Sequence, residues 1–398
     1  MKKLLSIIIL SCVTGYALNA QCPVRFKGNE RSNVGIYIEE IATGNKIVEY
    51  NSRQSMTPAS IMKSLTCATA LNLLGADYQF ETGFYLVGTD PMNGSADLVI
   101  MADADPTMGS RHFKSSTHVM DSVAAYLIEL GATYIDGNID INGDVLPDGG
   151  GVLPQWEVED ITEYYGVGLY PLNWYDNYFE SDQIIPSPED YFVQQLGEVL
   201  TMNEIEINAN ELDFHADSLA LDSLHIYTHR SAPLKQIMRS LMVRSDNLMA
   251  DGTLRALAPF QPRDSAISMV KEFWGALGVS LDESRILDGS GLARGNALAP
   301  DQLGRILTLM ARSELCDDYV SLFPVAGKDF SLLSGTKLSG RMALKSGSMT
   351  GVHTYAGYLL DRKTRKPTHT VVIMVNNFYC SRAQLKKAIE NYFLQTLK

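Results

Sequence analysis

Ser60 and Lys63 stand three residues apart at the beginning of an apolar segment, with Pro58 just before them and Gly75 at its end. Proline is typical of the first turn of a helix and glycine of its end, so the segment is predicted to be helical. Side chains three residues apart lie on the same helix face, which places the Ser60 hydroxyl beside the Lys63 amine. Burial in apolar surroundings makes a lysine less basic, so Lys63 could accept the serine proton. The pair therefore predicts a serine nucleophile with its own base, and acyl transfer as the chemistry.

This spacing is not specific on its own. A chain of 398 residues contains roughly one or two Ser-x-x-Lys matches by chance. A second match does occur at 334–337, in a glycine-containing stretch that no predicted helix follows. The assignment of Ser60 as a nucleophile therefore depends on what the rest of the chain contains.

Two further motifs follow the first. Ser245-Asp246-Asn247 interrupts a helical pattern that begins at Pro233, and Lys345-Ser346-Gly347 ends a predicted strand. The three motifs occur in the order that is typical of penicillin-binding proteins and serine β-lactamases. They also fall at a helix start, between two helices and in a strand, so a chance match is a poor explanation.

The apolar patterns around these motifs predict a mixed α+β protein. Alternating or continuous apolar runs indicate strands, and apolar residues at helical spacing indicate helices. Strands are predicted at 34–40, 47–50, 84–88, 98–102, 134–142, 223–229, 342–345, 355–360 and 370–376. Helices are predicted at 58–74, 117–130, 194–202, 233–242, 248–257, 265–277, 300–310 and 383–397. The predicted elements favour one sheet built from both chain ends, with residues near 76–225 inserted between them.

The last predicted helix has an apolar stripe that two structures could explain. Leu385, Ile389, Phe393 and Leu397 recur at four-residue steps. Such a stripe could anchor a helix to a membrane surface, but packing on the sheet is the expected arrangement.

The N-terminal residues predict export. Two lysines precede an apolar run at 4–10, and small residues lead to Ala20, so 1–20 is predicted to be a signal peptide. Cys12 leaves a lipoprotein signal as an alternative. No other run is long enough to span a membrane, so we expect a periplasmic protein, soluble or peripherally associated with the cell wall. The formal net charge of −13 argues against binding nucleic acid or anionic lipid through bulk charge.

The remaining cysteines do not have the spacing of a zinc site or a redox dithiol. Cys22, Cys67, Cys316 and Cys380 form no Cys-x-x-Cys pair. Cys67 lies in the apolar helix and is expected to be a buried thiol. Export permits disulfides, so a bridge from Cys380 to Cys22 or to Cys316 stays open.

With its three motifs, the chain resembles peptidase family S13. These are D-alanyl-D-alanine carboxypeptidases and endopeptidases, also described as class C low-molecular-mass penicillin-binding proteins. Further matching stretches lie at 57–60, 74–75, 104–107, 135–138, 156–160, 231–234, 288–294 and 351–357.

The resemblance implies a fold and a division into domains. It implies a β-lactamase/transpeptidase-like domain, an antiparallel sheet flanked by helices, formed by 21–75 and 226–398. A smaller α+β domain at 76–225 would be inserted after the Ser-x-x-Lys helix. Larger family members carry a further small domain, and only a brief polar link stands in its place between Phe179 and Pro186.

The resemblance also implies the catalytic roles. Ser60 would attack the carbonyl between two D-alanines and form an acyl-enzyme, with Lys63 as its base. Ser245 would relay a proton between Lys63 or Lys345 and the leaving amine. Asn247 would hydrogen-bond the substrate's peptide backbone.

The strand motif would hold the substrate's terminal carboxylate. Lys345 and the Ser346 hydroxyl would make this charge-assisted contact, and Gly347 would belong to the same substrate-binding stretch. The family usually has threonine where this chain has Ser346, but the hydroxyl is retained. Backbone N–H groups of Ser60 and Ser348 would form the oxyanion hole.

A pocket for the diaminopimelate side chain is implied at Asp160, Tyr165 and Arg294. Asp160 would face a substrate amine and Arg294 a carboxylate, as a zwitterionic stem peptide requires. A surface ion pair and a core tyrosine are the alternative explanation for these three residues.

The predicted function is a D,D-carboxypeptidase for peptidoglycan stem peptides that end in D-Ala-D-Ala, with endopeptidase action on cross-links as a second activity. β-Lactam antibiotics would be covalent inhibitors. The balance of the two activities, the stem-peptide diamino acid and the oligomeric state stay open.

Several other functions are disfavoured. A β-lactamase would share the motifs but not the long insert, and a related esterase usually has tyrosine in place of Ser245. A Ser-His-Asp hydrolase is not indicated because no Gly-x-Ser-x-Gly sequence occurs. His225 and His229 lack obvious further metal ligands, so no metal or cofactor is expected. A catalytically silent wall-binding or assembly protein would not need all the motif residues.

Overall fold

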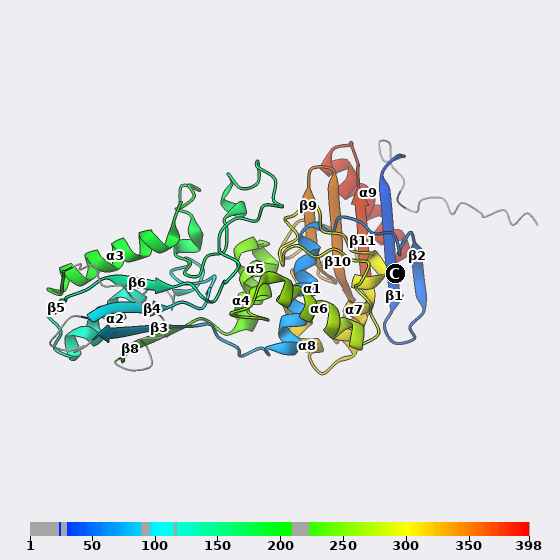
Figure 1. Ribbon diagram of the computed structural model, residues 1–398. Helices are drawn as coiled ribbons and strands as arrows, with labels where there is room; N and C mark the ends of the chain where they lie inside the picture. The colour runs from blue at the N-terminus through cyan, green and yellow to red at the C-terminus, as the bar shows by residue number, and fades with distance from the viewer. Residues whose placement is uncertain (1–23, 25–29, 89–95, 115–117, 209–222, 398) are drawn as a thin grey trace, which may run out of the picture.

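The computed structural model describes residues 24, 30–88, 96–114, 118–208 and 223–397. Its elements form two parts that lie side by side, each built around a sheet (Figure 1). The strands are β1 (Asn33–Glu40), β2 (Lys46–Tyr50), β3 (Glu81–Gly88), β4 (Ala96–Met101), β5 (Tyr134–Ile135), β6 (Ile139–Asn142), β7 (Glu206–Ile207), β8 (Ser223–Arg230), β9 (Met342–Met349), β10 (Val352–Leu360) and β11 (Pro367–Asn376). The helices are α1 (Met62–Leu73), α2 (Val119–Glu129), α3 (Pro188–Met202), α4 (Leu234–Arg244), α5 (Asn247–Arg255), α6 (Arg263–Ala276), α7 (Pro300–Arg312), α8 (Cys316–Ser321) and α9 (Arg382–Thr396).

The larger sheet joins the two ends of the chain. Its strand order is β2-β1-β11-β10-β9, and each neighbouring pair is antiparallel. Every residue of β10 is buried, because helices cover both faces of the sheet. This explains why the sequence of β10 is not a simple alternation of apolar and polar residues. The predicted sheet from both chain ends is thus present, and the predicted α+β fold is confirmed.

Helix α9 covers one face of this sheet. Leu385, Ile389, Phe393 and Leu397 are buried in one apolar cluster with residues of β1, β10 and β11. The opposite face packs against α1 and α4–α8, which form a second cluster with Tyr37. The stripe on the last helix therefore packs on the sheet and does not form a membrane-facing surface.

The smaller part is built on a sheet of strand order β6-β4-β3-β8. Helices α2 and α3 pack on it through residues such as Leu127 and Phe192. The single strand predicted at 134–142 is wrong, since β5 pairs with β7 and only β6 joins this sheet. The chain turns between them at Gly137, where an added Cβ would lie 2.3 Å from the Ala96 carbonyl oxygen. The backbone at Gly137 therefore lies too close to that of Ala96 for any side chain, and the turn at this glycine separates β5 from β6.

The boundary expected at residue 225 falls inside a strand. β8 continues to Arg230 and pairs with β3 along its length, so 226–230 lie in the smaller sheet. The Ser231 N–H then donates to the Phe80 carbonyl oxygen at 3.0 Å, where the chain enters and leaves this part. If each sheet is kept in one domain, the chain returns to the larger domain at Ser231 and not at residue 226. The division into two domains itself stays a prediction.

Two helices differ from the predicted ranges. α3 begins at Pro188, not at residue 194, because Ser187 caps it by accepting the Asp190 N–H at 3.2 Å. α8 was not predicted, since its six residues are too few for an apolar period to show. The link after Phe179 is a tight turn, in which the Phe179 N–H donates to the Gln183 carbonyl oxygen at 2.8 Å.

The structure bears on the cysteine and membrane predictions. Cys67, Cys316 and Cys380 carry free thiols, and Cys67 is buried, so no Cys316–Cys380 bridge is present. Cys22, Cys12 and the predicted signal peptide lie outside the described residues. Among the helices of the described chain, none has the length and apolar character needed to cross a membrane.

Candidate active site

The Ser60 hydroxyl lies at the start of α1, in a 3-10 turn at Ala59–Ile61. Ala59 has a positive φ of 50°, which turns the chain sharply before the helix. The Pro58 carbonyl accepts a 2.7 Å hydrogen bond from the Thr354 hydroxyl on β10. The turn that carries Ser60 is therefore attached to β10 of the larger sheet.

Lys63 is fully buried and its ammonium has three acceptors. Its Nζ donates to Ser60 Oγ at 3.0 Å, Asn247 Oδ1 at 2.6 Å and the Ser290 carbonyl oxygen at 2.7 Å. Burial lowers the pKa of Lys63 to about 8, although the Asp288, Asp251 and Asp246 carboxylates oppose the shift. An appreciable fraction of this amine is therefore neutral near pH 7, as a base for the Ser60 proton requires.

The second motif sits between α4 and α5. Ser245 ends α4 in the left-handed conformation with φ 61°, and Asp246 caps α5 by accepting the Met249 N–H at 2.8 Å. Ser245 Oγ accepts a 2.9 Å hydrogen bond from Lys345 Nζ. The Asn247 amide donates to the Tyr165 carbonyl at 2.7 Å. The break in the helix thus brings both Ser245 and Asn247 to lysines from the other two motifs.

The third motif runs along β9. Lys345 is buried, and its Nζ also donates to the Ser346 carbonyl at 2.8 Å. Burial lowers the pKa of Lys345 well below its usual value, and the neighbouring Lys63 lowers it further. A Cβ on Gly347 would lie 2.9 Å from the Ser60 nitrogen and 2.3 Å from Thr354 Oγ1. Only glycine allows β9 to pass this close to the Ser60 turn.

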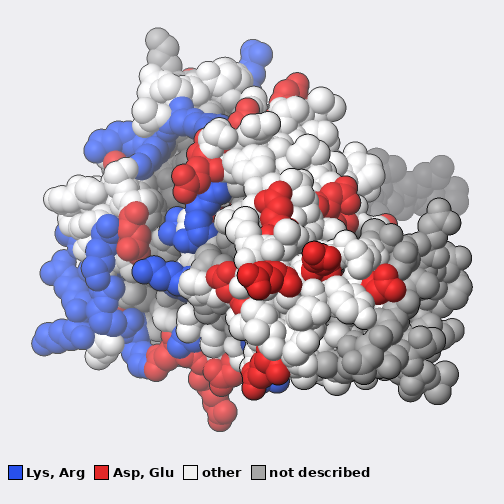
Figure 2. Space-filling model, turned by 90° about the vertical axis from the view of Figure 1, so that its left-hand side faces the viewer, with Lys and Arg blue, Asp and Glu red and all other residues white. Residues whose placement is uncertain are grey.

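A cavity of about 680 Å³ opens over these motifs. Figure 2 shows a hollowed face of the molecule on which acidic and basic side chains gather. Lys63 and Lys345 are buried, and neither they nor Ser346 and Gly347 are among the residues that line the cavity. The predicted site residues that do line it are named next. They are Ser60, Ser245, Asn247, Ser348, Asp160, Tyr165 and Arg294.

The three residues of the predicted side-chain pocket, Asp160, Tyr165 and Arg294, all line this cavity. The Tyr165 hydroxyl donates to Asp160 Oδ1 at 3.1 Å, and Tyr165 is 38% exposed, so it is not a core tyrosine. Arg294 donates to the Thr350 carbonyl at 3.1 Å, and its ion-pair partner is Glu157 at 3.7 Å. Asp160 and Tyr165 are thus in contact, whereas Arg294 is paired with neither of them in the described contacts, so their common pocket stays a prediction.

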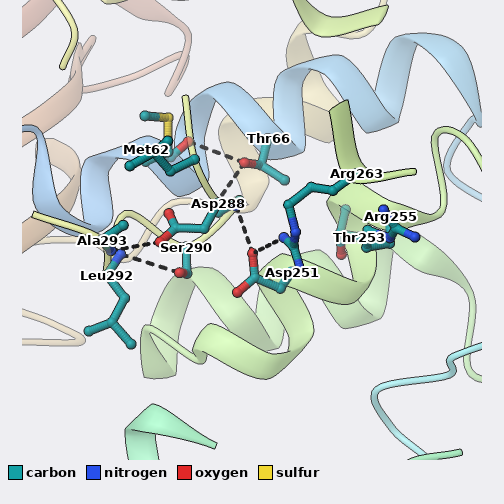
Figure 3. A network of polar contacts seen from close by, with 12 residues as sticks. Met62, Thr66, Asp251, Thr253, Arg255, Arg263, Asp288, Ser290, Leu292 and Ala293 are labelled. Carbon is teal, nitrogen blue, oxygen red and sulfur yellow. Dashed lines mark hydrogen bonds and ion pairs between the residues drawn. The ribbon is translucent and has the colours of Figure 1, made fainter. Parts of the chain in front are cut away.

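Asp288 is a buried carboxylate in the turn that contains Ser290, and Figure 3 shows both residues. Its two oxygens accept four hydrogen bonds of 2.6–2.9 Å, from the backbone N–H groups of Gly291 and Ala293 and from the side chains of Asn296 and Trp156. These bonds fix the turn whose Ser290 carbonyl faces Lys63.

Asp251 holds the same turn from the other side. Its carboxylate accepts a hydrogen bond from the Gly289 N–H at 2.7 Å and forms an ion pair with Arg263 at 3.5 Å. Figure 3 shows Asp251 facing Arg263. Burial raises the pKa of Asp251 to about 6, and Arg263 opposes the shift. A pair of buried carboxylates thus surrounds the turn next to the Lys63 ammonium.

No role was predicted for Asp288, Trp156 or the Ser290 carbonyl, although the stretches that contain them resemble the family. An Asp-Gly-Ser-Gly turn after a predicted helix could have indicated a buried side chain that caps its own turn. The link to Trp156 had no such signal, because the partner lies 132 residues away.

The alternative sites of the sequence do not resemble a reactive centre. Ser334 is exposed and its hydroxyl donates to the Ser331 carbonyl at 2.9 Å. His229 lies 3.6 Å from Asp105, and His225 contacts the Thr228 hydroxyl at 2.8 Å. Within the described ranges, no group of three or more His, Cys, Asp or Glu residues could hold a metal ion.

Comparison with known proteins gives consistent matches along the chain. Residues 24–183 and 184–393 match the family described as "D-Ala-D-Ala carboxypeptidase 3 (S13) family". The "D-alanyl-D-alanine carboxypeptidase DacB" of Haemophilus influenzae is 23% identical over 85% of this chain and 84% of its own. The "Carboxypeptidase DacB" of Mycolicibacterium smegmatis is 24% identical, over 84% of this chain and 75% of its own. The crystal structure of penicillin binding protein 4 from H. influenzae has a similar fold, with a TM-score of 0.79, 20% identity and coverage of 93% of this chain and 98% of that one.

Proposed function

The chain belongs to the D-Ala-D-Ala carboxypeptidase 3 (S13) family, and we propose that it forms an acyl-enzyme at Ser60 with peptidoglycan stem peptides that end in D-Ala-D-Ala. It is a serine D-Ala-D-Ala carboxypeptidase of the penicillin-binding type, and we propose endopeptidase action on cross-links as its second reaction. The observation that carries the proposal for Ser60 is the 3.0 Å contact from a buried lysine to a hydroxyl that reaches the cavity.

The geometry supports a two-step reaction. The neutral Lys63 amine takes the Ser60 proton while Oγ attacks the carbonyl carbon of the bond between the two D-alanines. The oxyanion that forms would face the backbone N–H groups of Ser60 and Ser348. Ser245, bonded to Lys345, gives its hydroxyl proton to the departing nitrogen as the C–N bond breaks, and the proton taken from Ser60 replaces it through the lysines. Water then attacks the ester carbonyl and gives a proton to the neutral Lys63 amine. The bond from the carbonyl carbon to Oγ breaks, and Ser60 Oγ takes that proton.

Two groups of residues are assigned to the recognition of the stem peptide. Lys345, with Ser346, Gly347 and Ser348 on β9, would hold the terminal carboxylate. Asp160, Tyr165 and Arg294 would hold the charged end of the diamino acid's side chain, which carries both an amine and a carboxylate. Unlike charges at the two ends of one pocket suit such a zwitterion.

Arg294→Gln should lower kcat/KM for D-alanine release from a diaminopimelate pentapeptide by about 10- to 100-fold, since a charge-assisted contact is lost. Acylation by benzylpenicillin, which lacks this side chain, should fall much less. The measurement is steady-state release of D-alanine beside the rate of penicillin adduct formation. Arg285→Gln, an exposed arginine of the preceding segment, is the matched control. Equal loss with both compounds would remove the pocket assignment.

The proposal is tested by mass spectrometry of the protein after incubation with benzylpenicillin. A stable adduct is expected, and tryptic digestion should place it in the peptide 54–63, which contains Ser60, and not in 329–337, which contains Ser334. Release of D-alanine from a pentapeptide should accompany it. Drug hydrolysis without an adduct would favour a β-lactamase, and neither adduct nor turnover would favour a silent wall-binding protein.

Export to the periplasm is part of the same proposal. It is supported by the lysines and apolar run within 1–20 and by the cell-wall substrate, which lies outside the cytoplasm. β-Lactams are the covalent inhibitors that an acyl-enzyme of this kind would bind.

A further inference from the structure

We propose that the end of the cavity next to Ser245 is a second subsite, formed by Arg111, Asp176 and Arg244, for the acidic peptide strand that leaves when a cross-link is cut. The inference rests on the proposed function and goes further, since it assigns the endopeptidase reaction its own recognition residues. We call these three residues the leaving-strand subsite.

The leaving-strand subsite is part of the cavity that contains Ser60. Arg244 is exposed and immediately precedes Ser245, and within the described chain its guanidinium has no hydrogen bond or ion pair. Arg111 is held in place, with Nε 3.1 Å from Asp176 Oδ2, Nη2 donating to the Tyr178 carbonyl at 2.8 Å, and the guanidinium 4.5 Å from the Tyr178 ring centroid. One arginine is therefore fixed and the other is free to take a ligand.

Asp176 supplies the second observation. Only 2% of its surface is exposed, and among the described residues its Oδ1 has no hydrogen-bond partner. Buried polar atoms are nearly always paired, so an unpaired oxygen that lines a cavity indicates a ligand donor. Tyr175, Asp176 and Asn177 all have positive φ, of 55°, 60° and 61°. A left-handed backbone is strained in residues other than glycine, and strain of this kind is typical of ligand sites.

The direction of the substrate follows from Ser245. This hydroxyl passes the proton to the departing nitrogen, so the released strand must begin beside it. Asp160 accepts a hydrogen bond from Tyr165, and a row of three neighbouring tyrosine rings leads from Tyr165 to Tyr178, over which the Arg111 guanidinium lies. The Tyr165 and Tyr164 centroids are 5.6 Å apart, and those of Tyr164 and Tyr178 5.4 Å. The cavity therefore has one charged end for the acyl strand and another for the leaving strand.

The chemistry of a cross-link matches this second end. In carboxypeptidase action the leaving group is one D-alanine, whose carboxylate the β9 motif holds. In cross-link cleavage the leaving nitrogen belongs to the side chain of a diamino acid within a second stem peptide. That peptide carries further carboxylates, which suit Arg111 and Arg244, and backbone N–H groups, which suit Asp176 Oδ1. The nearby Asp246 caps α5 and is already bonded to the Met249 N–H.

The test compares two substrates with the same purified protein. One is a monomeric pentapeptide, from which D-alanine is released, and the other a cross-linked tetrapeptide dimer, which is cut into monomers. Arg244→Gln should lower the ratio of kcat/KM for dimer cleavage to kcat/KM for D-alanine release by about 10- to 100-fold. Arg239→Gln, on the same helix and paired with Asp329 away from the cavity, should leave the ratio within about twofold of the wild type.

The outcomes separate this inference from the proposed function. A ratio unchanged in Arg244→Gln, equal loss of both activities, or a wild-type protein that releases D-alanine but never cuts the dimer would each overturn the leaving-strand subsite. Failure of the wild type both to release D-alanine and to bind benzylpenicillin covalently would instead overturn the proposed function. Thermal unfolding of Arg244→Gln is expected to match the wild type, because the exposed side chain makes no hydrogen bond or ion pair with the described residues.

Discussion

Lys63→Ala is expected to slow acylation by benzylpenicillin about 10²- to 10⁴-fold, the range by which a positioned general base accelerates a reaction. The nearest amine to Ser60 Oγ is Lys63 Nζ at 3.0 Å, and the truncated side chain leaves no base in hydrogen-bond contact with the hydroxyl in the described structure. The rate of adduct formation, followed by mass spectrometry at several drug concentrations, measures the loss. Lys337→Ala, which removes the lysine of the other Ser-x-x-Lys match, is the control and should retain the wild-type rate.

The pH dependence gives the same prediction a second readout. The pKa of Lys63 is lowered to about 8, and the base must be neutral to accept a proton. Wild-type acylation should therefore rise with pH up to about pH 8 and level above it. Lys63→Ala should lose this rise. If it kept both the rate and the profile, Lys345, whose pKa burial also lowers, would become the base instead.

The parts of the site that follow from local sequence were predicted, because helix spacing and chain order act over a few residues. Ser60 and Lys63 meet because three residues make nearly one helical turn. Ser245 reaches its place because the sequence interrupts a helix there. The fold class followed from strands at both chain ends.

The parts that depend on distant partners could not be predicted. Apolar alternation identifies a strand but not its neighbour, so the pattern at 223–229 did not show that β8 pairs with β3. Likewise, the position of Asp176 depends on three left-handed residues in succession, a conformation that no side-chain pattern there indicates. The supporting contact of Asp288 with Trp156 joins the two parts of the molecule and has no local cause.

Asp288→Ala is the second prediction with a large effect, and it concerns stability. Removal of this carboxylate leaves four buried donors without their acceptor, and an unsatisfied buried donor costs about 1–3 kcal/mol. Some donors will find water in the space that opens, so we expect the free energy of unfolding to fall by about 3–5 kcal/mol. Urea denaturation followed by tryptophan fluorescence measures it. Asp282→Ala, at an exposed carboxylate of the preceding loop, should change it by less than about 0.5 kcal/mol.

The same substitution should move the pH profile of acylation in a defined direction. Among the carboxylates that raise the pKa of Lys63, Asp288 has the largest effect. Without it the ammonium is less stabilised, so the pKa of Lys63 falls below about 8 and the rising part of the profile moves to lower pH. The acylation rate itself should also decline, because the Ser290 carbonyl that orients Lys63 is no longer held. A shift to higher pH, or a stability loss as small as that of Asp282→Ala, would contradict a role for Asp288 in both holding the turn and setting the charge of the base.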